Sequence, residues 1–114
     1  MIVDFIRLFL VALGFIERPA LVAATVPQHP GPAEFVDGRL LVVTNGALQK
    51  WACFRCPCGC GERVLLSLAE NRRPRWSVSV DWLGRPTLSP SINRLDGCRS
   101  HFWVRRGRIE WCRA

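Results

Sequence analysis

The sequence lacks the uninterrupted run of roughly 20 apolar residues that an ordinary transmembrane helix needs. Its longest apolar stretch, Ile2 to Ile16, is broken by Asp4 and Arg7. The stretch also lacks the positively charged start of a secretory signal peptide, although residues 22–24 resemble a cleavage site. We therefore expect no membrane span, a cytoplasmic protein, and an N-terminal helix that packs on the domain or on a partner.

Internal repeats and low-complexity tracts are also absent, and the composition excludes a wholly disordered chain. Hydrophobic residues make up 49% of the sequence and charged residues 22%, with five Trp and six Phe. A chain of 114 residues forms one domain with a modest core, in which a metal crosslink would be a large part of the stability. We expect a hydrophobic helix over residues 1–17 and a β-rich domain over residues 18–114.

Lysine is scarce, and acidic residues are scarce in the second half of the chain. Only one of the 16 basic residues is lysine. Residues 1–50 carry four basic and four acidic groups, whereas residues 51–114 carry 12 basic and five acidic groups and so the whole excess of +7. Arginine suits phosphate and carboxylate binding. Codon bias in a G+C-rich gene would produce the same enrichment, so both explanations stay open.

Short runs of β-branched and aromatic residues predict a mainly β fold built from short antiparallel strands and hairpins. Pro19 ends the first helix, Asn45-Gly46 is a hairpin turn, and a basic turn over residues 70–74 joins two strands. Pro90 interrupts one strand. The predicted strands span residues 20–26, 39–44, 48–54, 63–68, 76–80, 87–92, 101–105 and 108–112.

The last two predicted strands form a hairpin around the turn Arg106-Gly107. In this register Val104 faces Ile109, Phe102 faces Trp111, and His101 faces Cys112. The first four of these side chains share one apolar face, which we expect in the core. Cys112 is thereby placed beside His101.

Six cysteines in a short chain indicate either disulfides or a metal site. Cys56, Cys58 and Cys60 alternate with Pro57 and Gly59, and a Cys-x-Cys pair makes a poor disulfide because its ring is strained. Cys98 and His101 form a Cys-x-x-His pair, a spacing typical of zinc ligands. Two ligands from each segment would close a tetrahedral site, so we predict one structural Zn²⁺ ion that crosslinks the two halves of the domain.

The pattern leaves open which members of the cysteine triplet bind. Cys53 is a further candidate, because Cys53-x-x-Cys56 is also a ligand spacing found in zinc sites. Cys112, beside His101, is a candidate for an extra ligand or for a thiol that supports the ligands. A catalytic zinc site would need an acid–base group, for which Glu62 is the only obvious candidate. His29, in a proline-rich loop, is expected to be an ordinary loop residue. No phosphate-binding loop or acid–base pair is visible, and a structural ion is favoured.

Three motifs together resemble the bacterial DUF6527 family of small, cysteine-rich proteins. They are Cys-Pro-Cys-Gly-Cys-Gly from residue 56, Leu-Ser-Pro-Ser-Ile over residues 88–92, and Cys-Arg-Ser-His-Phe-Trp-Val from residue 98. The resemblance covers roughly residues 20–112 and implies metal binding by Cys56, Cys58, Cys60, Cys98 and His101. It also implies an accessory role in a ubiquitin-like conjugation system. The apolar N-terminus and Cys53 lie outside the pattern.

Three functions compete at this point. The favoured hypothesis is a zinc-stabilised, non-enzymatic interaction module with a protein partner, linked to a ubiquitin-like or phage-related system. The first alternative is a nucleic-acid-binding module, because arginines 72, 73 and 75 adjoin Trp76 and arginines 105, 106 and 108 follow Trp103. The second alternative is a zinc hydrolase that uses Glu62 as its base. Neither the partner nor the oligomeric state follows from the sequence.

Overall fold

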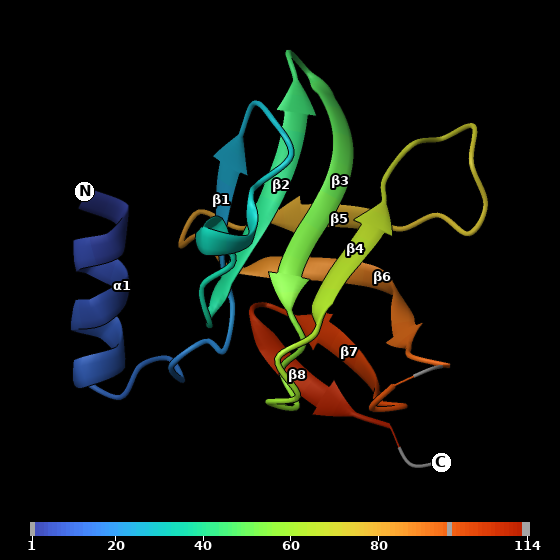
Figure 1. Cartoon of the computed structure of the whole chain (residues 1–114). Helices are drawn as coiled ribbons and strands as arrows, with labels where there is room; N and C mark the ends of the chain where they lie inside the picture. Colours follow the sequence, from blue (N-terminus) through green and yellow to red (C-terminus); the bar gives the residue numbers. More distant parts are fainter. Residues whose placement is uncertain (1, 96, 113–114) are drawn as a thin grey trace.

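The computed structural model of the chain describes residues 2–95 and 97–112. One N-terminal helix and eight short strands confirm the predicted mainly β class (Figure 1). In chain order the elements are α1 (Ile2–Ala12), β1 (Val22–Val26), a 3-10 helix (Pro32–Glu34), β2 (Arg39–Asn45), β3 (Leu48–Arg55), β4 (Arg63–Ser67), β5 (Ser77–Val80), β6 (Pro86–Asn93), β7 (His101–Arg105) and β8 (Arg108–Trp111).

The strands form two four-stranded sheets, ordered β1-β2-β3-β4 and β5-β6-β7-β8. All neighbouring strands pair antiparallel except β1 and β2, which run parallel. Parallel pairing requires a long connection, which the segment with the 3-10 helix provides. The predicted basic turn over residues 70–74 joins β4 of one sheet to β5 of the other, so its two flanking strands are not a hairpin. Figure 1 shows β5 and β6 crossing behind the strands of the first sheet.

The main core lies between the two sheets, where their inward side chains meet. Phe54 of β3 and Phe102 of β7 are both fully buried, and their rings meet edge to face with centroids 6.4 Å apart. Leu40 of β2 and Leu88 and Ile92 of β6 pack in the same cluster. Every second residue of a strand faces inward. Residues next to these core positions, such as Ser91 and His101, therefore point to the outer face of the second sheet.

A smaller core covers the outer face of the first sheet. Leu41 and Val43 of β2 pack there with Phe35, which follows the 3-10 helix, and with Cys53 of β3. Strand β2 is consequently buried on both faces, as its burial from Leu40 to Val43 shows. Cys53 is fully buried in this cluster, and desolvation raises the pKa of its thiol to about 11.

The predicted register of the last hairpin is confirmed, with Phe102 opposite Trp111 and Val104 opposite Ile109. The expectation that Trp111 belongs to the core is wrong, since 54% of its surface is exposed. Strand β8 is the edge strand of its sheet, so it has a neighbouring strand on one side only. The ring of Trp111 still contacts Phe102, with centroids 5.6 Å apart.

Helix α1 ends earlier than residue 17 because the chain turns at Gly14. Gly14 has a φ of +81°, and the amide of Phe15 donates to the carbonyl of Leu10, which is a glycine-terminated helix cap. The helix is anchored through Arg7, whose Nη1 donates to the carbonyl of Leu83 at 2.9 Å. None of the helices in the described residues has the length and apolarity to cross a bilayer.

Candidate functional site: a cysteine cluster and a serine–histidine pair

The cysteine triplet occupies a tight loop between β3 and β4. The amide of Cys56 donates to the carbonyl of Glu62 at 2.9 Å, and the amide of Gly59 donates to the carbonyl of Cys56 at 3.3 Å. Gly59 and Gly61 have φ values of +89° and +82°, a conformation that side-chain-bearing residues rarely adopt. These glycines allow the loop to fold back so that its thiols converge.

Four thiols meet at this loop: those of Cys56, Cys58, Cys60 and Cys98. The Sγ atom of Cys56 lies 3.4 Å from that of Cys58 and 3.6 Å from that of Cys98. All four sulfur atoms lie within 4.8 Å of one another. Zinc–sulfur bonds of about 2.3 Å in a tetrahedron separate the sulfurs by about 3.8 Å. The cluster therefore has the donor number, the donor chemistry and the spacing of a four-thiolate metal site.

Hydrogen bonds favour the thiolate form of two of these cysteines. The Ser100 hydroxyl and then its backbone amide donate to the Cys98 sulfur and lower its pKa to about 6. Hydrogen bonding by Ser100 is also the largest cause of the lowered pKa of Cys58. Burial instead raises the pKa of Cys56 to about 12. Since thiolate sulfur is the metal ligand, Ser100 prepares part of the site for an ion.

The structure brings together four of the five predicted ligands, and His101 has a different contact. Its Nε2 atom lies 2.9 Å from the Oγ atom of Ser91. Among the described residues, the metal-compatible group consists of the four cysteines and includes neither Cys53 nor Cys112. Cys112 does lie beside His101 as the register predicted, because its amide donates to the carbonyl of His101 at 2.8 Å.

Ser91 and His101 meet because β6 and β7 pair across an irregularity. The register shifts between Leu88 and Ile92, in the stretch that contains Pro90, and Asn93 lies opposite His101. Ser91 and His101 are diagonal neighbours on the outer face, within reach of each other's side chains. The indole Nε1 of Trp76 donates to the carbonyl of Ser91 at 3.3 Å, which holds the serine backbone from the other side.

A serine hydroxyl within hydrogen-bond distance of an imidazole is the arrangement of a nucleophile and its base. Neither residue is fully buried, so the pair is accessible from the outer face of the sheet. The sequence pattern did not single out Ser91. The available signal was its place in the Leu-Ser-Pro-Ser-Ile motif, on a strand predicted to precede the last hairpin.

The segment 94–101 connects the cysteine cluster to the serine–histidine pair. It follows β6, contains Cys98, and ends at His101, the first residue of β7. The amide of Arg94 donates to the carbonyl of Ser100 at 2.7 Å, and the Arg94 side chain pairs with Glu62 in the cysteine loop at 2.8 Å. Glu62, the candidate base of a zinc hydrolase, is thus part of an ion pair that joins the two loops.

The arginine and tryptophan groups of the nucleic-acid hypothesis contact one another and nearby backbone. The guanidinium of Arg105 lies 4.5 Å from the ring centre of Trp103 and pairs with Glu110 at 2.7 Å. Arg73 donates to two backbone carbonyls of its own turn, and Arg75 lies 3.7 Å from Glu70. These side chains have intramolecular partners in this structure.

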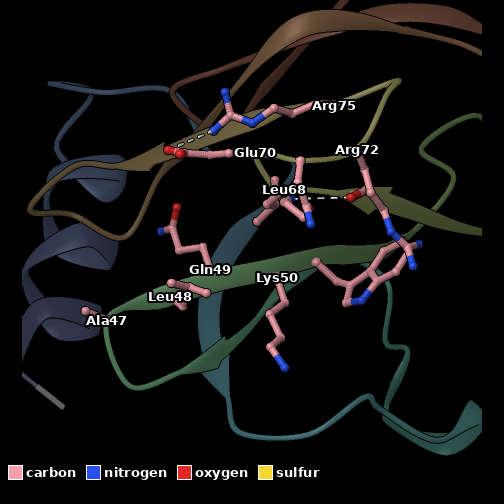
Figure 2. Close-up of a pocket in the computed structure, with 12 residues that line it drawn as sticks. Ala47, Leu48, Gln49, Lys50, Leu68, Glu70, Arg72 and Arg75 are labelled. Atoms are coloured by element: carbon pink, nitrogen blue, oxygen red, sulfur yellow. Dashed lines mark hydrogen bonds and ion pairs between the residues drawn. The ribbon is translucent and has the colours of Figure 1, made fainter.

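A cavity of about 620 Å³ lies between the start of β3 and the turn that follows β4 (Figure 2). Leu48, Lys50 and Trp51 line one side, and the segment from Ser67 to Arg72, with Arg75, lines the other. Figure 2 shows the ion pair of Glu70 and Arg75 at its rim. The turn continues into Trp76, which holds the backbone of Ser91.

A family model matches residues 26–112, and its description is "Bacterial ubiquitination-like system serine protease (BubE)". The chain belongs to the BubE family. The resemblance to DUF6527 is therefore wrong, because the matching model is that of BubE. The expected link to a bacterial ubiquitin-like system is confirmed at the level of the family. Neither the curated proteins nor the solved structures compared with the chain give a match.

Proposed function

We propose that this BubE-family chain is a serine protease in which Ser91 is the nucleophile and His101 is the general base. The observation that carries the proposal is the 2.9 Å contact between Ser91 Oγ and His101 Nε2 on neighbouring strands. The family's description, which names a serine protease, supports the same chemistry. Both favour an enzyme over the non-enzymatic module expected from the sequence.

In the proposed reaction, Ser91 Oγ attacks the carbonyl carbon of a peptide bond while His101 Nε2 takes the hydroxyl proton. His101 then gives this proton to the leaving amine, which leaves an acyl ester on Ser91. Water attacks the ester carbonyl, loses its proton to His101 and releases the carboxylic acid, after which the proton returns to Ser91. This sequence requires the resting His101 ring to carry its proton on Nδ1 and to accept at Nε2.

We further propose that Cys56, Cys58, Cys60 and Cys98 hold one zinc ion. The ion would supply a structural crosslink between the β3–β4 loop and the segment that precedes β7. Cys98 lies three residues before His101, so the crosslink would position the start of β7. Free thiols in such a cluster suit a reducing compartment, and we propose the cytoplasm as the place of action.

The substrate class that fits this family is a polypeptide of a bacterial ubiquitination-like system. We propose that the protein partner expected from the sequence is this substrate.

Labelling with a fluorophosphonate followed by peptide mapping tests the proposed nucleophile. We expect the label on Ser91, and we expect Ser91→Ala and His101→Ala to abolish it. Ser89→Ala is the matched control because Ser89 lies on the same strand, is exposed, and should leave labelling unchanged. A label that persists in Ser91→Ala would refute the proposal.

Metal content measured on the same variants separates the two sites. We expect one zinc per chain in the wild type and in His101→Ala, and loss of the zinc in Cys98→Ser. The four-cysteine site would be contradicted if His101→Ala lost its zinc while Cys58→Ser and Cys60→Ser both kept it. That result would make the His101 imidazole a zinc ligand.

A further inference from the structure

The N-terminal helix carries its apolar side chains on the outside. The exposed large apolar residues of this segment are Ile2, Val3, Phe5, Leu8, Phe9, Leu13 and Phe15. Phe5 and Phe15 expose 72% and 75% of their surface. A helix on a water-exposed surface normally turns such residues inward and its polar residues outward. In helix α1 the charged Arg7 is turned inward to the domain, and the half-exposed Asp4 pairs with it along the helix.

The orientation of the helix is fixed by Arg7. Its side chain is buried against the turn after β5, where Nη1 donates to the carbonyl of Leu83 at 2.9 Å, while Nη2 pairs with Asp4 at 2.6 Å. A side chain at Gly84 would meet this guanidinium at 3.1 Å, so the glycine leaves room for it. At 100° per residue, Ile2, Phe5 and Phe9 lie on the face opposite Arg7.

Arginines gather beside Phe15 and Ile16, the apolar residues that follow α1. Phe15 and Ile16 share a hollow of about 270 Å³ with Arg85, Arg106 and Arg108. Arg18 adjoins it and is exposed. Asp81 pairs with Arg85 and Glu17 with Arg108, so four arginines and two carboxylates leave a local charge of +2.

We propose that α1 binds the surface of an anionic phospholipid bilayer. Its apolar face would enter the boundary between headgroups and acyl chains, and the neighbouring arginines would contact headgroup phosphates. The helix lies in the plane of the membrane, because at 11 residues it is too short to cross one. The family match begins at residue 26, after α1, so the membrane contact is a property added to the BubE domain.

The surface fits a bilayer better than a protein or a second copy. The outward face of α1, around Ile2, Phe5 and Phe9, holds no polar side chain that could form the hydrogen bonds of a protein interface, and the polar groups beside the segment have a net positive charge that suits lipid phosphates. A symmetric pair of copies would bring two positively charged rims together. An anionic lipid surface matches both the apolar face and the charge beside it.

Vesicle flotation of the full chain tests the proposal. The probes are vesicles of equal parts phosphatidylcholine and phosphatidylglycerol, and vesicles of phosphatidylcholine alone. We expect binding to the anionic vesicles that weakens with salt, and at least about tenfold weaker binding to the neutral ones. The variant Phe5→Ser/Phe9→Ser should lose at least about a hundredfold in affinity, because each buried Phe contributes roughly tenfold or more. Arg106→Gln should lose about fivefold.

Leu65→Ser is the matched control, since Leu65 is an exposed apolar residue of β4 and its replacement should leave vesicle binding unchanged. Thermal unfolding of each variant confirms that it is folded. The proposal is overturned if the folded wild type fails to bind vesicles, or if it binds neutral and anionic vesicles equally. It is also overturned if the wild type is a dimer that ignores vesicles and that Phe5→Ser/Phe9→Ser converts to a monomer.

Discussion

The cysteine cluster and the serine–histidine pair are joined by the short stretch from Cys98 to His101, yet they form in different ways. The cluster depends mostly on local sequence, because three of its four thiols come from five consecutive residues. The pair depends on strand pairing, because Ser91 and His101 meet only where β6 and β7 join. One site is built by a loop and the other by a sheet.

We therefore expect the cysteine cluster to affect the stability of the fold, and Ser91 to affect the proposed reaction. A metal held by the cluster would tie the β3–β4 loop to the segment before β7, so its loss affects the fold first. Ser91 has little to do with the core, because its neighbour Ile92 makes the inward contact. Changes at Ser91 should therefore affect the reaction alone, and changes at the cluster should affect both.

The largest expected effect comes from removing Ser91, the proposed nucleophile. Ser91→Ala should lower peptide-bond hydrolysis at least about a thousandfold while the melting temperature stays that of the wild type. The rate of hydrolysis of a polypeptide substrate measures the activity, and thermal unfolding measures the melting temperature. Activity retained by Ser91→Ala, with Ser89→Ala as the control, would contradict the separation of the two sites.

The second effect is expected from removing the proposed zinc ion. Cys98→Ser, or a strong chelator, should lower the melting temperature by at least about 10 °C and abolish activity, because the binding energy of a structural ion is part of the folding energy. Cys112→Ser is the control, since Cys112 lies outside the cluster. A melting temperature unmoved by chelation would show that the cluster is not a structural metal site.

A smaller effect is expected at the link between the two sites. A Cβ atom at Gly97 would clash with the carboxylate of Glu62, and the φ of this residue is +66°. Gly97→Ala should therefore destabilise the fold by about 1–2 kcal/mol and displace Glu62 from Arg94. Chemical denaturation measures the change in unfolding free energy.

Gly46→Ala provides the comparison for that measurement. Gly46 has a similar φ of +62° but nothing within 4 Å of the added Cβ, so it reports the backbone cost alone. Equal destabilisation by the two variants would mean that the contact with Glu62 carries no energy.

The smallest effect is expected at the backbone support of the nucleophile. Trp76→Phe removes the indole N–H that donates to the carbonyl of Ser91. The rate of hydrolysis should fall about fivefold, the equivalent of one hydrogen bond of about 1 kcal/mol. Trp82→Phe, at an exposed and unrelated position, should leave the rate unchanged. If Trp76→Phe hydrolysed the substrate as fast as the control variant, Trp76 would have no role in positioning Ser91.

Local patterns in the sequence predicted much of the fold. Asn45-Gly46 indicated the hairpin between β2 and β3, although Asn45 is still paired with Leu48 and the turn itself is Gly46 and Ala47. Arg106-Gly107 indicated the register of β7 and β8. The parallel pairing of β1 with β2 and the passage from one sheet to the other after β4 are long-range features, and alternation within a strand carries no information about them. The exposure of Trp111 depends on the edge position of β8, which follows from the order of the strands.

The candidate site divides in the same way. The sequence predicted Cys56, Cys58 and Cys60 because they lie close together along the chain. It predicted Cys98 because this residue begins a Cys-x-x-His pair, a spacing typical of zinc ligands. His101 was expected at the metal because it completes that pair in sequence. Its side chain instead faces Ser91, since strand alternation and the register shift in β6 decide where it points.

The order of Ser91 and His101 along the chain has a consequence for when the proposed catalytic pair can form. Ser91 belongs to a strand that is synthesised before His101, and the two side chains meet only after β7 has joined β6. A growing or misfolded chain therefore carries a serine without its base. On the proposed mechanism, completion of the second sheet is the step that brings the nucleophile and its base together.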